Sequence, residues 1–178
     1  MLIKEGYMKA LTTALCCLLF SAAAFASWGD IPDSVKTELI TRSYNGDAQL
    51  TIRMMYATRS TMTALYESKD GAPISDDELN GIFAELDRLW PSQPAVLVGV
   101  IPNGTQYFWP WKLAFTQGNM QYDVESGDYA HMTESFNAGQ LREGTVAIGF
   151  VVIPERIDIT QSFRIWYDDE YTVIPPLP

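Results

Sequence analysis

The stretch Ala95–Ile101 reads AVLVGVI, and the stretch Thr145–Ile153 reads TVAIGFVVI. Both runs consist almost entirely of β-branched and other apolar residues. Pro94 and Pro102 enclose the first run, and Pro154 closes the second. Continuous apolar runs of this length, bounded by residues that break regular structure, are typical of strands buried in the centre of a sheet. These two segments therefore predict a fold that is built around a β-sheet.

Further segments have the patterns of strands that flank such a core. Apolar and other side chains alternate over residues 50–57, 111–116 and 120–124, and Gly118-Asn119 is a turn signal between the last two. Residues 163–167 form another β-prone run. Since successive side chains of a strand point to opposite faces, this alternation indicates half-buried strands. About seven short strands separated by turn signals favour an antiparallel β-sandwich.

One amphipathic helix is expected between these strands. Residues 75–78 read SDDE, a capping box in which Ser75 and Glu78 accept hydrogen bonds from each other's backbone N–H groups. An apolar stripe with helical spacing follows, formed by Leu79, Ile82, Phe83, Leu86, Leu89 and Trp90. Pro91 then ends the helix. The predicted fold class is mainly β with α+β character: an antiparallel β-sandwich with one inserted amphipathic helix near residues 76–90.

The amino-terminal segment has the features of a cleavable secretory signal peptide. Lys4 and Lys9 precede an apolar core at residues 10–20. Residues 24–26 read AFA, which fits the A-x-A cleavage rule. The apolar core is shorter than the roughly 20 residues of a membrane span. A start at Met8 would give a cleaner export signal. The alternative to a signal peptide is a buried amino-terminal helix. We expect residues 1–26 to be removed, and residues 27–178 to form a single periplasmic or secreted domain.

The expected mature chain is acidic and has no cysteine. The whole sequence contains 12 Lys and Arg and 22 Asp and Glu residues. Its first 26 residues hold both cysteines, two lysines and one glutamate, which leaves 10 basic and 21 acidic residues and a formal charge of −11. Phosphate binding requires clustered Lys and Arg, so nucleic acid and anionic membrane surfaces repel such a chain. We expect neither as a partner, and no stable membrane span after cleavage.

Common catalytic motifs are missing from the sequence. His131 is the only histidine, and the mature chain offers no cysteine nucleophile. The sequence contains no G-x-S-x-G, S-x-x-K or H-E-x-x-H motif and no phosphate-binding glycine loop. A histidine-based zinc site would need ligands that this chain lacks. We therefore expect no catalytic residue, no cofactor and no metal site, and a protein that is more readily a binding module than an enzyme.

Three alternatives stay open. Soft copper ligands are available in His131 and the methionines, namely Met54, Met55, Met120 and Met132, although methionines also fill gaps in cores. The acidic run Asp168-Asp169-Glu170 offers oxygen ligands for calcium, or is a solvated turn. A hydrolase could take a pair of carboxylates from Asp123, Glu125, Asp128 and Glu134, but spacing alone does not show that two of them converge.

The aromatic run at residues 107–111, which reads YFWPW, is the strongest candidate for a binding surface. Such rings can form a flat platform for sugars or peptide. Alternatively, the rings fill the core: Trp111 and Trp109 would then face inward with Leu113 and Phe115, and Tyr107 would flank them. Phe108 would face solvent, and Pro110 would perturb the alternation. The core arrangement is the one favoured by the alternation. The candidate binding residues are Tyr107, Phe108, Trp109 and Trp111.

Three segments near the carboxyl end are similar to a pattern in Ig-like β-sandwich domains of the immunoprotective-extracellular type, which occur in bacterial surface and periplasmic proteins. These segments are residues 136–144 (FNAGQLREG), residues 149–154 (GFVVIP) and residues 163–167 (FRIWY). The resemblance implies a sandwich and implies binding rather than catalysis; it carries over no site residues.

The predicted function is that of an exported, non-catalytic binding or assembly module. Its partner would be another protein or a component of the cell envelope, held at an exposed sheet edge or at the aromatic run. The first alternative is a carboxylate-based periplasmic hydrolase, and a metal-handling protein comes after it.

Overall fold

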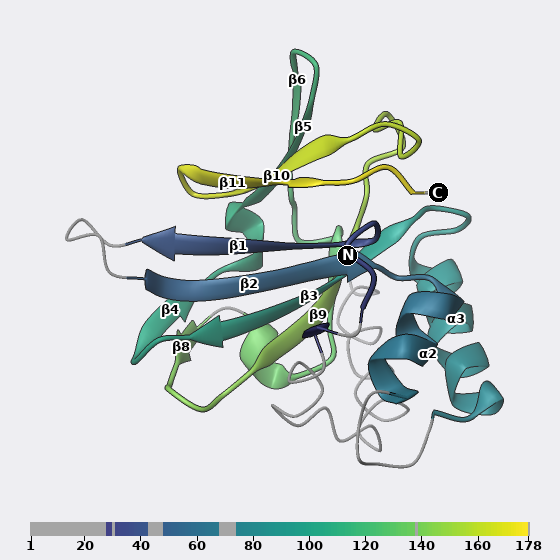
Figure 1. Cartoon of the computed structure of the whole chain (residues 1–178), viewed down its shortest axis with the longest axis horizontal. Coiled ribbons are helices and arrows are strands. Elements are labelled where there is room, and N and C mark those ends of the chain that lie inside the picture. Colours follow the sequence, from purple (N-terminus) through teal and green to yellow (C-terminus); the bar gives the residue numbers. More distant parts are fainter. Residues whose placement is uncertain (1–27, 30, 43–47, 68–73, 138, 178) are drawn as a thin grey trace, which may run out of the picture.

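The computed structural model describes residues 28–29, 31–42, 48–67, 74–137 and 139–177. The expected signal peptide, residues 1–26, lies outside the described residues. A five-stranded sheet has the strand order β1-β2-β3-β9-β7 (Figure 1). Its strands are β1 (Lys36–Arg42), β2 (Ala48–Tyr56), β3 (Ala95–Pro102), β9 (Ala147–Val152) and β7 (Tyr129–His131).

A second, four-stranded sheet has the order β11-β10-β5-β6. It consists of β11 (Glu170–Ile174), β10 (Phe163–Tyr167), β5 (Leu113–Gln117) and β6 (Met120–Asp123). A two-stranded ribbon pairs β4 (Gln106–Phe108) with β8 (Gly139–Leu141), and short 3₁₀ turns occur at η2 (Pro110–Lys112) and η3 (Glu134–Phe136). Every described strand pair is antiparallel. The prediction of a mainly β fold with antiparallel sheets and some helix is confirmed.

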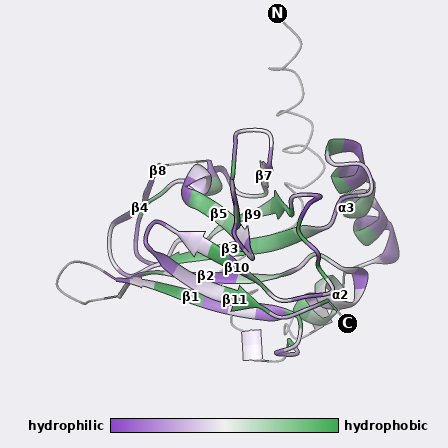
Figure 2. Cartoon of the chain, turned by 90° about the horizontal axis from the view of Figure 1, so that it is seen from above, coloured by the Kyte–Doolittle hydropathy of each residue, from purple (hydrophilic) through white to green (hydrophobic). Residues whose placement is uncertain are grey.

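The core lies between the two sheets. The register places Val96, Val98 and Val100 of β3 opposite Tyr56, Met54 and Ile52 of β2, so these side chains share one face of the larger sheet. That face meets the smaller sheet, because the Tyr56 and Phe163 rings are 6.4 Å apart and the Tyr56 hydroxyl donates to the Pro175 carbonyl at 2.8 Å. Figure 2 shows β3 and β9 as largely hydrophobic strands, as their sequences predict.

The two sheets also meet along one side, where β1 lies beside β11 (Figure 1). The hydroxyls of Thr37 on β1 and Thr172 on β11 are 2.6 Å apart and share a hydrogen bond. Each sheet thereby covers one edge of the other. An uncovered edge strand is a template for pairing with another chain, so this arrangement removes two such edges from the surface.

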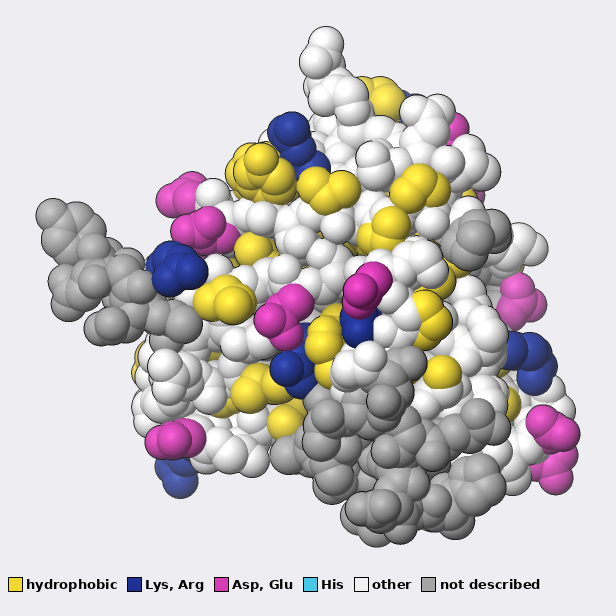
Figure 3. Space-filling view, viewed as in Figure 1, with side chains coloured by type: hydrophobic (Ala, Val, Ile, Leu, Met, Phe, Trp, Pro, Cys, Tyr) yellow, Lys and Arg dark blue, Asp and Glu magenta, His cyan; other side chains and the backbone are white. Residues whose placement is uncertain are grey.

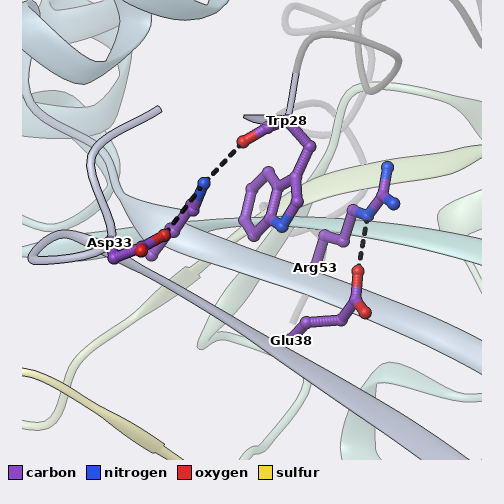
Figure 4. Close-up of polar contacts among 5 residues, drawn as sticks. Trp28, Asp33, Glu38 and Arg53 are labelled. Atoms are coloured by element: carbon purple, nitrogen blue, oxygen red, sulfur yellow. Dashed lines mark hydrogen bonds and ion pairs between the residues drawn. The ribbon is translucent and has the colours of Figure 1, made fainter. Parts of the chain in front are cut away.

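The described chain begins at Trp28, which lies against the outer side of β1 and β2 (Figure 4). Lys36 Nζ donates to the Trp28 carbonyl at 2.7 Å and pairs with Asp33 at 3.2 Å. Lys36 and Arg53 both lie over the indole, 5.5 and 5.6 Å from the ring centroid, and Arg53 pairs with Glu38 at 2.8 Å. Cation–π contacts of this kind attach Trp28 to the sheet.

The predicted helix is present as α3 (Asp76–Leu89), with both hydrogen bonds of the Ser75–Glu78 capping box. Its buried positions are Leu79, Ile82 and Leu86. Phe83 is only partly buried and has the Arg59 guanidinium 5.3 Å above its ring. The apolar stripe is therefore narrower than the sequence pattern predicts.

A second helix, α2 (Arg59–Glu67), which the sequence pattern does not predict, precedes α3. Reciprocal hydrogen bonds begin this helix: the Thr58 N–H donates to Thr61 Oγ1 at 3.0 Å, and the Thr61 N–H donates to Thr58 Oγ1 at 3.2 Å. Met62, Leu65 and Tyr66 of this helix are buried. The pattern that they form in the sequence is too short to predict a helix. Both helices lie at one end of the larger sheet (Figure 1).

Candidate binding site

The aromatic run 107–111 alternates between surface and core, but in the opposite sense to the expected one. Tyr107 is 54% exposed and Trp111 is 49% exposed, whereas Phe108 is fully buried. Residues 106–108 form β4, and Pro110 then begins the 3₁₀ turn η2, which ends before Leu113 starts β5. Because this turn interrupts the strand, Trp111 does not share the inward face of Leu113 and Phe115. The expectation that Trp111 faces the core and Phe108 faces solvent is therefore wrong.

Phe108 holds the segment to the core. Its ring lies 5.2 Å from Phe136 and 5.4 Å from Tyr167, and is nearly parallel to the tyrosine ring, with an interplanar angle of 16°. The Trp109 N–H donates to the Tyr167 hydroxyl at 3.2 Å. Burial raises the pKa of Tyr167 to about 12, against a lowering by the Trp109 N–H and with a further rise from Asp168. Phe108 is thus part of the core and is removed from the candidate binding residues.

The other three rings form an outward-facing row. Tyr107 and Trp109 stack with centroids 5.5 Å apart and an interplanar angle of 12°, and Trp109 lies 6.3 Å from Trp111. The ammonium of Lys112 lies 5.0 Å from the centroid of Trp109 and is paired with the carboxylate of Asp168 at 2.6 Å. Ring stacking and a cation–π contact restrict the motion of Trp109, so the row is a preorganised surface.

A cavity of about 530 Å³ opens beside Tyr107 and Trp109. It lies where β4, the ends of β1 and β2, and the turn between β10 and β11 come together. Its polar lining includes Arg42, Gln49, Lys112 and the acidic run 168–170. The aromatic run and the acidic run are therefore parts of one site, although they are some 60 residues apart in the sequence. The volume of the cavity is within the range of small-ligand sites, and polar and charged side chains make up most of its lining.

A second hollow, of about 260 Å³, lies on the other side of the Lys112–Asp168 ion pair. Trp111 and Trp166 both line it, together with Gln121 and Asp123. Beyond Trp166 comes Tyr171, which is 46% exposed and has its ring centroid 4.5 Å from the indole. In Figure 3, hydrophobic side chains gather over β10 and β11, next to acidic side chains at one end.

Trp166 and Tyr171 were not among the residues predicted from the sequence. The sequence of β10 contains a signal for Trp166. Phe163, Ile165 and Tyr167 alternate along the strand and are buried, so Trp166, between the last two, lies on the opposite face. The same alternation places Tyr171 on the outer face, since Trp166 and Tyr171 are partners in the register of β10 and β11.

The metal alternative receives no support from the positions of its residues. Met54 and Met55 are fully buried in the core, whereas Met120 is 48% exposed at the β5–β6 turn. His131 is half-buried on β7, and burial lowers its pKa, against a rise from Glu134. Within the described part of the chain, no group of three His, Cys, Asp or Glu residues could hold a metal ion.

Two of the four carboxylates proposed for a hydrolase take part in local hydrogen bonds. Asp128 accepts the Glu125 N–H at 2.9 Å within one turn, and Asp123 accepts from Gln121 at 2.8 Å. Glu134 begins the 3₁₀ turn η3. Among these four residues, Asp123 is the one that lines the second hollow.

Comparisons with known proteins give little further information. No family model matches the chain, and no curated protein matches its sequence. A solved structure of a functionally unknown protein from Listeria monocytogenes EGD-e is similar to it at 10% sequence identity and a TM-score of 0.36. The similarity covers 82% of this chain and 84% of that chain.

Proposed function

We propose that the protein is an exported, non-catalytic binding module. The observation that carries this proposal is the preorganised aromatic row of Tyr107, Trp109 and Trp111, which borders a cavity lined by charged and amide side chains. Tryptophan and tyrosine are among the residues that most often dominate binding energy at interfaces. Phe108 and the Tyr167 hydroxyl hold the backbone under the row, so ligand binding costs little ordering of the segment.

The proposed partner is a protein or a component of the cell envelope outside the cytoplasm. The signal-like segment 1–26 supports export. The similarity of segments 136–144, 149–154 and 163–167 to Ig-like domains of bacterial surface proteins supports a binding role. In the described residues no helix is long and apolar enough to cross a membrane. Export is tested by intact-mass measurement of the protein from the exported fraction. A mass that matches a chain beginning at Ser27 supports the proposal. A mass that matches a chain still containing Cys16 and Cys17 contradicts it.

Binding through the aromatic row is tested with a double variant, Tyr107→Ala with Trp111→Ala. Both side chains are about half exposed, so the variant should fold normally, which circular dichroism and thermal unfolding check. Met120→Ala is the matched control, because Met120 is equally exposed but lies at the β5–β6 turn.

The assay is capture from a cell-envelope extract on immobilised protein. Wild type and Met120→Ala should retain the same partner, and the double variant should lose it. Equal capture by all three proteins would place the binding surface elsewhere. No capture, together with turnover of a glycoside or ester by the purified protein, would replace the binding module with the hydrolase.

A further inference from the structure

The aromatic row continues beyond the segment that the sequence singles out. Tyr107, Trp109 and Trp111 follow one another at 5.5 and 6.3 Å, and Trp111 shares the second hollow with Trp166. Trp166 in turn lies 4.5 Å from Tyr171. Five rings thus form a band from β4, past the Lys112–Asp168 ion pair, to the outer face of β10 and β11.

Polar groups accompany this band along its length. The larger cavity beside Tyr107 presents the Gln49 and Gln106 amides and the acidic run 168–170, and the smaller hollow beside Trp111 presents Gln121 and Asp123. The Trp166 Nε1–H is already used by Thr116 Oγ1, at 2.9 Å, which fixes the orientation of the indole. The band therefore combines flat rings with amides and carboxylates, of which the Gln106 amide donates to the Asn103 carbonyl at 3.1 Å and the Gln121 amide to Asp123 at 2.8 Å.

The charges along the band nearly cancel. Its carboxylates are Asp123, Asp168, Asp169 and Glu170, and its cations are Arg42, Lys112 and Arg164, the last of which lies 4.8 Å above the Tyr171 ring. Binding of a polyanion would require an excess of cations, and here the carboxylates are in slight excess. The charge pattern fits a neutral ligand.

The position of the rings argues against an added peptide strand. Strand addition uses the backbone groups of a sheet edge, whereas Trp166 and Tyr171 are on the outer face of β10 and β11, and β11 has its edge beside β1. Sugar rings have apolar C–H faces that stack on aromatic rings and hydroxyl edges that pair with amides and carboxylates. This combination of groups is the one that the band offers.

We propose that the band binds a neutral glycan chain of several sugar units, which runs from Tyr107 to Tyr171. This inference rests on the proposed function and names its ligand class. It assigns Trp166 and Tyr171 to the site, and it makes affinity depend on chain length, because a monosaccharide reaches only one part of the band.

The test uses isothermal titration calorimetry with defined neutral sugars: cellohexaose, chitohexaose and maltohexaose, their disaccharides, and glucose. At least one hexaose should bind, and its affinity should exceed that of the matching disaccharide at least about tenfold, because separate contacts on one chain reinforce each other. Trp111→Ala and Tyr171→Ala should each weaken binding at least about fivefold, as is usual for aromatic residues that dominate an interface. Met120→Ala should leave it unchanged.

Other outcomes overturn the inference in distinguishable ways. If no hexaose binds while envelope capture still depends on Tyr107 and Trp111, the glycan inference is wrong and the binding module stands. If a hexaose binds equally well to wild type and to Tyr171→Ala, the ligand does not extend along the band. Tighter binding of an acidic hexaose, hexa-galacturonate, than of every neutral one would refute the neutral ligand class.

Discussion

Gly149 on β9 provides the sharpest test of the packing beneath the binding site. A Cβ at this position would lie 2.4 and 2.5 Å from Cδ1 and Cε1 of Phe136, and 2.7 Å from the carbonyl oxygen of Ala130. The ring of Phe136 is fully buried against Phe108, and Ala130 belongs to the neighbouring strand β7. Neither neighbour can move away without disturbing the core or the ladder between β7 and β9.

We expect Gly149→Ala to lower the free energy of unfolding by about 3 kcal/mol, the upper end of the usual cost of overpacking, because one of the clashes is with backbone. For a domain of this size, that loss corresponds to a fall of roughly 6–12 °C in melting temperature. The matched control is Gly81→Ala in α3, where an added Cβ has no atom within 4 Å. The same methyl group should stabilise there by about 0.5–1 kcal/mol, because alanine favours a helix over glycine.

Urea denaturation followed by tryptophan fluorescence measures both variants under identical conditions. The double variant Gly149→Ala with Phe136→Leu should lose less than the sum of the two single losses, because the smaller side chain relieves part of the clash. The Ala130 carbonyl remains, so relief should be incomplete. A Gly149→Ala protein as stable as wild type would refute this account of β9, η3 and the floor of the site.

The remaining predictions concern α3 and β7. Ser75→Ala should cost about 1 kcal/mol in urea denaturation, because the variant loses the N-cap bond that the Glu78 N–H donates to Ser75 Oγ. The Ser75 backbone N–H, the first cause of the lowered pKa of Glu78, is kept in the variant, so most of this loss should persist as pH falls through the acidic range. Ile82→Ala should cost about 2–5 kcal/mol in chemical denaturation, because Ile82 is buried. Phe83→Ala should cost clearly less, because that ring is only partly buried. Equal losses in the two variants would contradict the packing of α3. Burial lowers the pKa of His131, so the native state disfavours protonation of this side chain. The free energy of unfolding should therefore fall as pH drops below about 6.5. The His131→Gln variant should fold, bind no less metal than wild type, and lose this part of the pH dependence in unfolding experiments.

The strands and the helix with strong local patterns could be predicted from the sequence. The apolar runs became β3 and β9, the alternating segments became β2, β5 and β6, and the β-prone run 163–167 became β10. The strand β1 was missed because two of its inward positions carry threonine, which resembles a polar surface residue in a pattern. In the fold these hydroxyls have partners: Thr37 bonds Thr172, and Thr41 accepts the Leu50 N–H at 3.1 Å.

The short strands β4, β7 and β8 could not be predicted, since three residues contain no period and the strands exist through pairing with distant segments. For the same reason, the sequence does not predict that the parts of the site lie together. The aromatic run and the acidic run were each visible in the sequence. Their meeting depends on the register in which Tyr167 lies opposite Leu113, which brings Asp168 to Lys112 across 56 positions of sequence. Sequence spacing carries no record of that register.

The division of tasks within residues 107–111 has a consequence for protein engineering. Phe108, Pro110 and the Trp109 N–H fasten the segment, and all of these attachments are independent of the side chains at positions 107, 109 and 111. The three outward positions can therefore be randomised together while the anchor is kept. The segment is a short, rigid display site, on which a library of new recognition surfaces could be selected within an otherwise unchanged domain.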